Sequence, residues 1–335
     1  MRNRVKPTTL WSMISTVVLL AAGMSTRYGR LKQLEPVGPC GEALLDFSVF
    51  DARRAGFSRV LLIIREELEE IFRAHVEERW PGDLEVVFHH QKVRDLPGAH
   101  PDLTSSPACI EALERRAKPW GTGHALLTAR PHLPGPFVLL NADDFYGEAA
   151  FHQGAEFLLA QAASSDGEPP GADPAATFGL VTYTLSDTLS EHGGVSRGIC
   201  TVDLQGRLAG VQEILEIRRA GGEVSGKTVS GQPVVLDGTE PISTNFWIFS
   251  PDIFPILEEE FQEFLRDQTD PSSAQTEFLI PSVVNGAVRD RIARVMGIPT
   301  RGRFLGITHP EDRDWVAGGL EEMTHGGHYP SPLWG

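Results

Sequence analysis

The chain has 335 residues, 41% of them hydrophobic, and a formal net charge of −15. This acidic balance argues against nucleic acid and anionic membranes as partners, because both would be repelled over most of the surface. Three scattered cysteines without a C-x-x-C or metal-binding spacing predict unpaired thiols in a cytoplasmic protein. We expect residues 1–14 to form a flexible extension, and the apolar run at 17–22 is too short to span a membrane.

The run at 17–22 predicts a buried parallel strand, since it is apolar throughout. A loop of small residues and cations follows it, beginning at Gly23 and ending at Lys32. The backbone N–H groups of such a loop can surround an anion while the cations neutralise it. The spacing fits neither a P-loop nor a dinucleotide fingerprint, so it predicts a polyphosphate site of another kind.

Helical and strand patterns alternate after this loop. The predicted elements are a helix over 43–56, a strand over 60–64, a helix over 66–80, a strand over 84–89, a helix over 121–130 and a strand over 137–142. This alternation is typical of a three-layer α/β fold with a doubly wound, mostly parallel sheet, which binds ligands at the carboxyl ends of its strands. Residues 93–119 predict a long loop, either a lid or disorder, with a short helix near 110–116.

A polar Gly/Pro stretch at 164–173 predicts a linker between an NTP-binding half, 15–165, and an acceptor-binding half, 174–322. The second half has the shorter alternation of antiparallel strands, with a hairpin turn at Gln205-Gly206. We expect strands over 178–184, 199–203 and 242–249, and helices over 251–265, 275–285 and 310–320. The tail at 323–335 is expected to be loose.

Asp143 and Asp144 end the strand at 137–142, which predicts carboxylates at the mouth of the sheet beside the cationic loop. Magnesium prefers a few carboxylates together with phosphate oxygens and water. We therefore predict that Mg²⁺ joins Asp143 to a bound triphosphate. The alternative is that the pair caps a helix and begins a turn, work that Asp144 alone can do.

The segment L-A-A-G followed by R-x-G-x-x-K resembles the signature loop of the nucleotidyltransferases that join an NTP to a phosphorylated small molecule. G-T-G-H-A at 121–125 is similar to the nucleotide-binding segment of the N-acetylglucosamine-1-phosphate uridylyltransferases and, more loosely, of sugar-phosphate nucleotidylyltransferases in general. The order of the motifs between 16 and 249 is also that of the family. The resemblance implies a nucleotide-diphospho-sugar transferase fold, GT-A-like, with a small antiparallel acceptor-binding subdomain. It implies Mg²⁺ as cofactor, an NTP and a phosphorylated small molecule as partners, and a sugar 1-phosphate as the first candidate acceptor.

The resemblance also implies roles for matching residues. Lys32, Arg27 and Asp143 would be catalytic, with the metal on Asp143 and Asn245. The nucleotide would lie against Ala22, Gly23, Met24, Ser25, Thr26, Gly121 and Thr122, and the acceptor against Gly194, Arg197 and Glu213.

Two departures from the family leave the substrates open. The glutamine that reads a pyrimidine shortly before G-T-G is absent, since Arg116, Lys118, Pro119 and Trp120 occupy that approach. Ile214 stands where many relatives carry a lysine on the sugar phosphate.

Three alternatives therefore remain. The first is a cytidylyltransferase for phosphocholine or another alcohol phosphate, with Trp120, Trp247 or Tyr146 facing a quaternary ammonium. The second is a non-catalytic nucleotide sensor, against which an intact Asp143 argues. The third is a glycosyltransferase of the same general fold, which usually shows D-x-D rather than adjacent aspartates. The apolar C-terminal helices could pack within the chain or between chains, so a homo-oligomer stays open.

Overall fold

The computed structural model describes residues 16–23, 26–27, 30–98, 110–111, 113, 116, 118–165, 176–267 and 276–334. Three expected features lie wholly or largely outside these residues: the extension at 1–14, the loop at 93–119 with its short helix, and the linker at 164–173. The side chains of Thr26, Arg27 and Arg30 are also outside the description, although their backbone is within it.

The N-terminal half of the sheet is parallel. Its strands pair in the order β5-β4-β1-β6. They are β1 (Thr16–Leu20), β4 (Arg59–Ile64), β5 (Glu85–His90) and β6 (Phe137–Asn141). The predicted α/β class is confirmed, and because the strands are parallel, the carboxyl ends of β1 and β6 lie next to each other at one edge.

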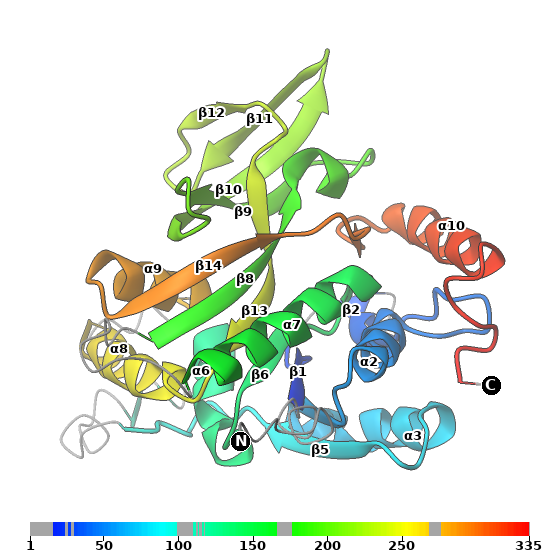
Figure 1. Cartoon of the computed structure of the whole chain (residues 1–335), viewed down its shortest axis with the longest axis horizontal. Helices are drawn as coiled ribbons and strands as arrows, with labels where there is room; N and C mark the ends of the chain where they lie inside the picture. Colours follow the sequence, from blue (N-terminus) through cyan, green and yellow to red (C-terminus); the bar gives the residue numbers. More distant parts are fainter. Residues whose placement is uncertain are drawn as a thin grey trace, which may run out of the picture.

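The second half of the sheet is mainly antiparallel. β13 (Pro241–Phe249) pairs with β6 and links the halves, while β9 to β12 form an arm that rises above the parallel strands in Figure 1. The other strands are β8 (Ala176–Thr184), β9 (Val195–Val202), β10 (Leu208–Ala220), β11 (Glu223–Thr228), β12 (Pro233–Leu236) and β14 (Ala293–Pro299). The predicted turn at Gly206 is confirmed, with a φ of 77° and an N–H bond to Asp203 O. The sequence patterns missed β10, β11, β12 and β14.

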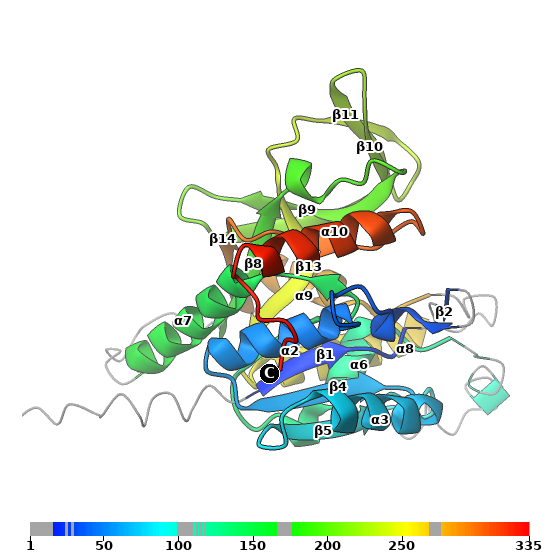
Figure 2. The ribbon, with the colours of Figure 1, turned by 90° about the vertical axis from the view of Figure 1, so that its right-hand side faces the viewer.

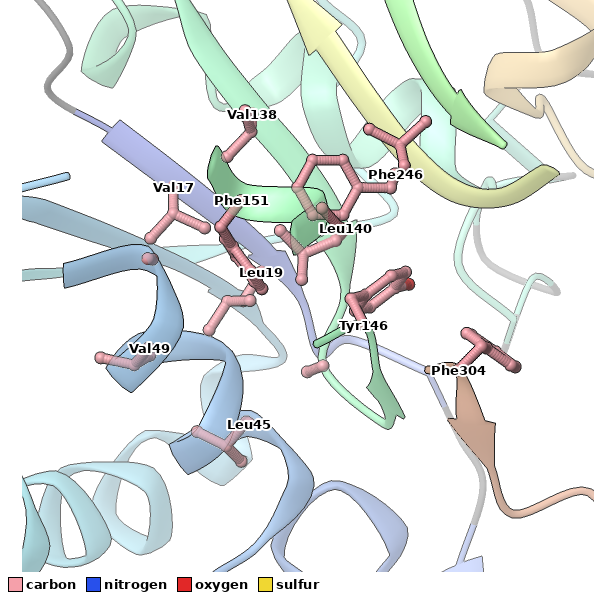
Figure 3. Close-up of a cluster of buried hydrophobic side chains, with 14 of the residues drawn as sticks. Val17, Leu19, Leu45, Val49, Val138, Leu140, Tyr146, Phe151, Phe246 and Phe304 are labelled. Atoms are coloured by element: carbon pink, nitrogen blue, oxygen red, sulfur yellow. The ribbon is translucent and has the colours of Figure 1, made fainter. Parts of the chain in front are cut away.

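Helices cover both faces of the sheet and make the three predicted layers (Figures 1 and 2). Val17 and Leu19 of β1 belong to one apolar core, and Val18 belongs to the other. Figure 3 shows Val17 and Leu19 beside Leu45 of α2. One face carries α2 (Leu44–Arg54), α3 (Glu69–Arg79) and α7 (Glu148–Ser165), the last not predicted; the other carries α6 (Thr122–Thr128), α8 (Ile253–Asp267) and α9 (Ile280–Arg289).

Short elements complete the fold. They are β2 (Thr26–Arg27), β3 (Arg30–Leu31), β7 (Asp144–Phe145), β15 (Leu305–Gly306) and the 3₁₀ turns η1 (Lys32–Leu34), η2 (Glu66–Leu68), η3 (Arg130–His132) and η4 (Leu185–Thr188). The last helix is α10 (Asp312–His325). Within the described residues, every helix is too short or too polar to cross a membrane.

The expectation of a loose C-terminal tail is wrong. Beyond α10, Tyr329 and Leu333 are only 4% and 2% exposed and pack in a core with Phe47 of α2. The Tyr329 hydroxyl donates to Asp51 Oδ2 at 2.6 Å, and the Leu333 N–H donates to Glu42 Oε1 at 3.3 Å. Figure 2 shows this segment crossing α2. Burial of these apolar side chains and the two hydrogen bonds offset conformational freedom that the segment loses on packing.

Asp51 lies beneath the tail and gives the fold a pH dependence. Burial raises the pKa of Asp51 to about 7, against the lowering effects of Tyr329 and Arg54, and Glu148 adds to the rise. The unfolded chain loses this proton at a pKa of about 4, so the folded state loses stability as the pH rises from about 4 through about 7. We expect the thermal midpoint of the wild type to fall between about pH 5 and about pH 8, and Asp51→Asn to fall less. Equal falls, measured by calorimetry, would contradict this assignment.

Candidate active site

Two predicted catalytic side chains meet at the carboxyl ends of β1 and β6. Lys32 Nζ, in η1, donates to Asp143 Oδ2 at 2.5 Å, across 111 residues of sequence. Their side chains are 14% and 24% exposed, so both can still reach a ligand. The carboxylate holds the ammonium at the mouth of the sheet, which is where a ligand of a parallel α/β sheet is expected.

A cavity of about 270 Å³ lies beside this pair and contains part of the predicted nucleotide site. Its walls are Leu20, Ala22, Gly23, Gln33, Gln91, Lys118, Pro119, Gly121, Thr122, Ala125, Asn141, Asp143 and Glu277. Gly121 has a φ of 106°, and a Cβ there would lie 2.6 Å from Phe278 O, so the turn into α6 requires glycine. Of the other expected residues, Met24 and Ser25 lie outside the described residues, as do the side chains of Thr26 and Arg27.

Gln91, which the sequence analysis did not single out, also lines this cavity. It directly follows β5, is buried, and lines the cavity from a position 30 residues before Gly121. Its Nε2 donates to Gly121 O at 2.9 Å and lies 3.1 Å from His124 Nδ1. Its position directly after β5, at the carboxyl end of a strand, is the signal that could have singled it out.

The partners of Gln91 fix which way its amide faces. Burial lowers the pKa of His124 to about 4, so its ring is neutral at physiological pH. His124 Nε2 lies 2.6 Å from Asp95 O, which only a ring N–H can satisfy, and Nδ1 is then an acceptor. Both hydrogens of the Gln91 amide are therefore engaged, by Gly121 O and His124 Nδ1. The atom that Gln91 can offer to a ligand is the acceptor Oε1.

A second cavity, of about 420 Å³, shares Thr122 and Asn141 with the first. The predicted residues Arg197, Glu213 and Asn245 line it. The other walls are Asp144, Ser196, Gly198, Val211, Ser243, Thr244, Leu279, Pro281, Ser282, Asn285 and Phe304. Hydroxyl and carboxamide groups dominate its polar lining, which suits a ligand that carries several hydroxyl groups.

The structure does not bring Gly194 to this cavity. Gly194 lines a separate cavity of about 680 Å³ together with Arg218, Arg219 and Trp315. Its carbonyl oxygen lies 3.0 Å from His309 Nε2. Of the three predicted acceptor residues, Arg197 and Glu213 therefore share one cavity, and Gly194 lines a different one.

An irregularity in β13 presents Asn245 at this site. Asn245 has a φ of 63°, a conformation that asparagine tolerates better than most residues, and the pairing of β13 with β8 shifts register around it. The buried Tyr146 ties β13 to β6: its hydroxyl accepts from the Asn141 N–H at 3.1 Å and donates to Thr244 O at 2.8 Å. These two bonds hold the segment of Asn245 beside the carboxyl end of β6, which Asp143 follows.

Arg197 is anchored on the wall of the second cavity. Its guanidinium donates to Thr188 O at 2.7 Å and to Thr188 Oγ1 at 3.2 Å, and it stacks 5.5 Å from the centre of the Phe304 ring. Burial lowers its pKa, while Asp144 and Glu213 raise it. Burial raises the pKa of Glu213, and Arg197 opposes that rise. The cation and the two carboxylates thus balance one another around the cavity.

The residues at the strand ends fit magnesium. Burial and the neighbouring charge of Asp143 raise the pKa of Asp144 to about 6, although Lys32 and a hydrogen bond from Asn141 lower it. Two carboxylates this crowded favour a divalent cation, and carboxylate oxygens are ligands that Mg²⁺ prefers. Asn245, which lines the second cavity with Asp144, has an amide oxygen that accepts from Trp247 Nε1 at 3.2 Å. Among the described residues, no group of three or more His, Cys, Asp or Glu side chains could hold a metal. Phosphate oxygens and water would have to complete the coordination.

The aromatic residues proposed for a quaternary ammonium do not line either cavity. Trp120 is 4% exposed, and Trp247 and Tyr146 are fully buried in the cores that cover the sheet. The only aromatic residue among the described walls of the second cavity is Phe304. Large aromatic side chains bury more apolar area between sheet and helices than at a polar strand end, so this prediction is wrong. Ile214 is also buried in the core, 1% exposed.

No protein-family model and no curated protein matches this sequence. Solved structures match over almost the whole chain. Inositol-1-phosphate CTP transferase from T. maritima aligns with a TM-score of 0.57 and 13% identity over 94% of this chain and 98% of its own. UDP-glucose pyrophosphorylase, complexed with UDP-glucose, aligns at 0.54 and 14% over 92% and 99%. HddC from Yersinia pseudotuberculosis, complexed with GMP-PN, aligns at 0.51 and 15% over 92% and 100%. The chain therefore has the fold that these structures share, as the sequence resemblance implied.

Proposed function

We propose that this protein is a nucleotidyltransferase that transfers an NMP from an NTP to a phosphorylated small molecule. The acceptor is a sugar 1-phosphate or a similar polyol phosphate, and the products are an NDP-sugar and pyrophosphate. The contact between Lys32 and Asp143 carries the proposal, because Asp143 lines the nucleotide cavity, and this cavity shares Thr122 and Asn141 with the acceptor cavity. The CTP transferase and the UDP-glucose pyrophosphorylase among the similar structures support this reaction class.

The reaction is an in-line displacement at the α-phosphorus. An oxygen of the acceptor phosphate forms a bond to the α-phosphorus, while the bond to the bridging oxygen breaks and pyrophosphate leaves. Lys32 neutralises the charge that gathers on the α-phosphate, and Arg27 with the N–H groups of residues 23–26 holds the β- and γ-phosphates. Asp143 and Asn245, with Asp144 next to Asp143 in the chain, would hold Mg²⁺, and the bound ion would neutralise charge on phosphate oxygens. Binding both substrates in adjoining cavities brings the reacting atoms together, and this proximity supplies the remaining rate acceleration.

The acceptor cavity favours a polyhydroxylated body over choline. Glu213 can accept hydrogen bonds from hydroxyl groups, and Ser196, Ser243 and Ser282 can donate or accept them. A quaternary ammonium offers no such donors and is normally bound by several aromatic faces. The choline part of phosphocholine has no hydroxyl hydrogens for Glu213, and Phe304 is the one aromatic face among the described walls of this cavity. We therefore rank phosphocholine below sugar and inositol phosphates.

The experiment is magnesium-dependent pyrophosphate release from CTP, UTP, GTP, ATP or dTTP. Each NTP is paired with a panel of sugar 1-phosphates, inositol 1-phosphate and phosphocholine. Release with one pair would establish the reaction and identify both substrates. Binding of an NTP without release across the panel would favour a nucleotide sensor. A folded protein that binds none of the NTPs would overturn the proposal.

Gln91 is expected to recognise the base. In Gln91→Leu the acceptor Oε1 is lost, and a donor of the bound base is left unpaired in a buried site, at a cost of about 1 to 3 kcal/mol. The KM for the preferred NTP should rise about tenfold or more, while kcat changes less. Gln153→Leu is the matched control, because Gln153 lies on α7 and bonds to Pro299 O outside both cavities. Equal KM values in the two variants would remove Gln91 from base recognition.

A further inference from the structure

The first turn of α10 contacts the segment that carries Lys32. Arg313 Nε donates to Glu35 Oε1 at 2.9 Å, and its Nη2 donates to Pro36 O at 2.8 Å. Glu35 closes the 3₁₀ turn that begins at Lys32, because its N–H donates to Lys32 O at 3.3 Å. One guanidinium from the C-terminal helix therefore fixes the side chain and the backbone that directly follow the turn of Lys32.

The residue before Arg313 reaches the opposite side of the site. Asp312 Oδ1 accepts from Ser190 Oγ at 2.6 Å, and its Oδ2 accepts from the N–H groups of Thr308 and His309 at 2.9 and 2.7 Å. Ser190 belongs to the segment that follows η4, and Thr188 at the end of η4 holds the guanidinium of Arg197. Asp312 is thus connected to Arg197 through two residues of one short segment.

The contact between Arg313 and Glu35 is better suited to positioning than to stability. The side chains of Arg313 and Glu35 are 44% and 23% exposed. An ion pair this exposed usually contributes about 0 to 1 kcal/mol to folding. Its geometry is nevertheless specific, because the planar guanidinium bonds to two acceptors at once, which an ammonium on a flexible stem does not reproduce.

We infer that Asp312 and Arg313 are positioning residues of the transferase: Arg313 sets the place of Lys32 at the nucleotide, and Asp312 sets the place of Arg197 at the acceptor. The inference rests on the proposed function. Two consecutive residues of α10 thereby hold together the two halves of the site, which come from different halves of the sequence. Small displacements of a catalytic group reduce the rate steeply. The Arg313 contact should therefore affect kcat through Lys32, whereas the Asp312 contact should affect acceptor binding through Arg197.

The test compares Arg313→Ala, Arg313→Lys and Ser190→Ala with the wild type. Arg313→Ala should lower kcat about tenfold, leave the KM for the acceptor nearly unchanged, and shift the thermal midpoint little. Arg313→Lys should restore little of the rate, since an ammonium keeps the charge but does not reproduce the two simultaneous hydrogen bonds to Glu35 and Pro36. Ser190→Ala, which avoids disturbing the buried Asp312, should raise the KM for the acceptor several-fold with a smaller effect on kcat.

Glu322→Gln is the matched control, because Glu322 also lies on α10 and pairs with Arg303 at 2.9 Å away from both cavities. Hydrogen–deuterium exchange of the peptide around residues 32–36 gives a readout that does not depend on activity, and it should quicken in Arg313→Ala alone. A kcat and an exchange rate in Arg313→Ala equal to those of Glu322→Gln would overturn the inference while leaving the proposed function intact. Absence of transfer by the wild type would overturn the proposed function and the inference with it.

Discussion

Replacing Lys32 by alanine is expected to lower kcat for pyrophosphate release by about a hundredfold to a thousandfold, with a small change in KM for the NTP. Removing one preorganised charge partner from a reacting centre has effects of this size. Lys32 is only 14% exposed and is held by Asp143, so its ammonium is placed before the substrate arrives. Its charge is needed most as the acceptor phosphate approaches the α-phosphate, which is why the loss should fall on kcat.

Lys92→Ala is the control for this variant. Lys92 forms an exposed ion pair with Glu66 at 2.9 Å and lines neither cavity. Lys32→Ala should keep the circular dichroism spectrum of the wild type, since Asp143 remains partly solvated without its partner. A kcat of Lys32→Ala equal to that of Lys92→Ala would remove Lys32 from the mechanism.

Asp143→Asn is expected to have the second large effect. The amide keeps the size of the side chain and one acceptor oxygen, but it loses the negative charge that attracts Mg²⁺ and pairs with Lys32. We expect kcat to fall about a hundredfold or more. The magnesium concentration for half-maximal rate should rise at least about tenfold, because a neutral amide binds Mg²⁺ more weakly than a carboxylate does. A magnesium titration of the initial rate measures both quantities.

Asp83→Asn serves as the comparison, since Asp83 forms an exposed pair with Arg53 at 2.8 Å. An unchanged magnesium requirement in Asp143→Asn, together with a lowered kcat, would show that Asp143 acts through Lys32 rather than through the metal. An unchanged kcat would exclude both roles. The glycosyltransferase alternative predicts a different substrate, an NDP-sugar donor that is consumed rather than formed, and the product analysis of the same assay separates the two.

Several site residues could be predicted from the sequence because their signals are local. The apolar run before Gly23 ends in small and cationic residues, and the run before Asp143 ends in carboxylates. Once both runs are assigned to parallel strands, their carboxyl ends must lie at one edge of the sheet. The expected position of Asp143 beside the cationic loop follows from this topology, and the bond between Lys32 and Asp143 agrees with it.

Other features required the tertiary structure because their signals are not local. Nothing in the sequence near Gln91 indicates that its side chain bonds to the backbone of Gly121, 30 residues further on. The choice between cavity and core for Trp120 and Trp247 depends on which faces the helices cover. In the same way, Tyr329 and Leu333 have no pattern of their own, and they pack because the fold brings apolar side chains of α2 and α10 into one cluster with them.

The sequence by itself determined the α/β class and the order of the main elements from β1 to β6, because apolar periodicity and glycine placement act over a few residues. Only the tertiary structure decided which side chains share a cavity. It placed Arg197 and Glu213 together and Gly194 apart, and it joined Arg313 to the turn of Lys32. The physical reason is that such contacts arise from the packing of elements far apart in the chain, and packing depends on the shape of the whole core.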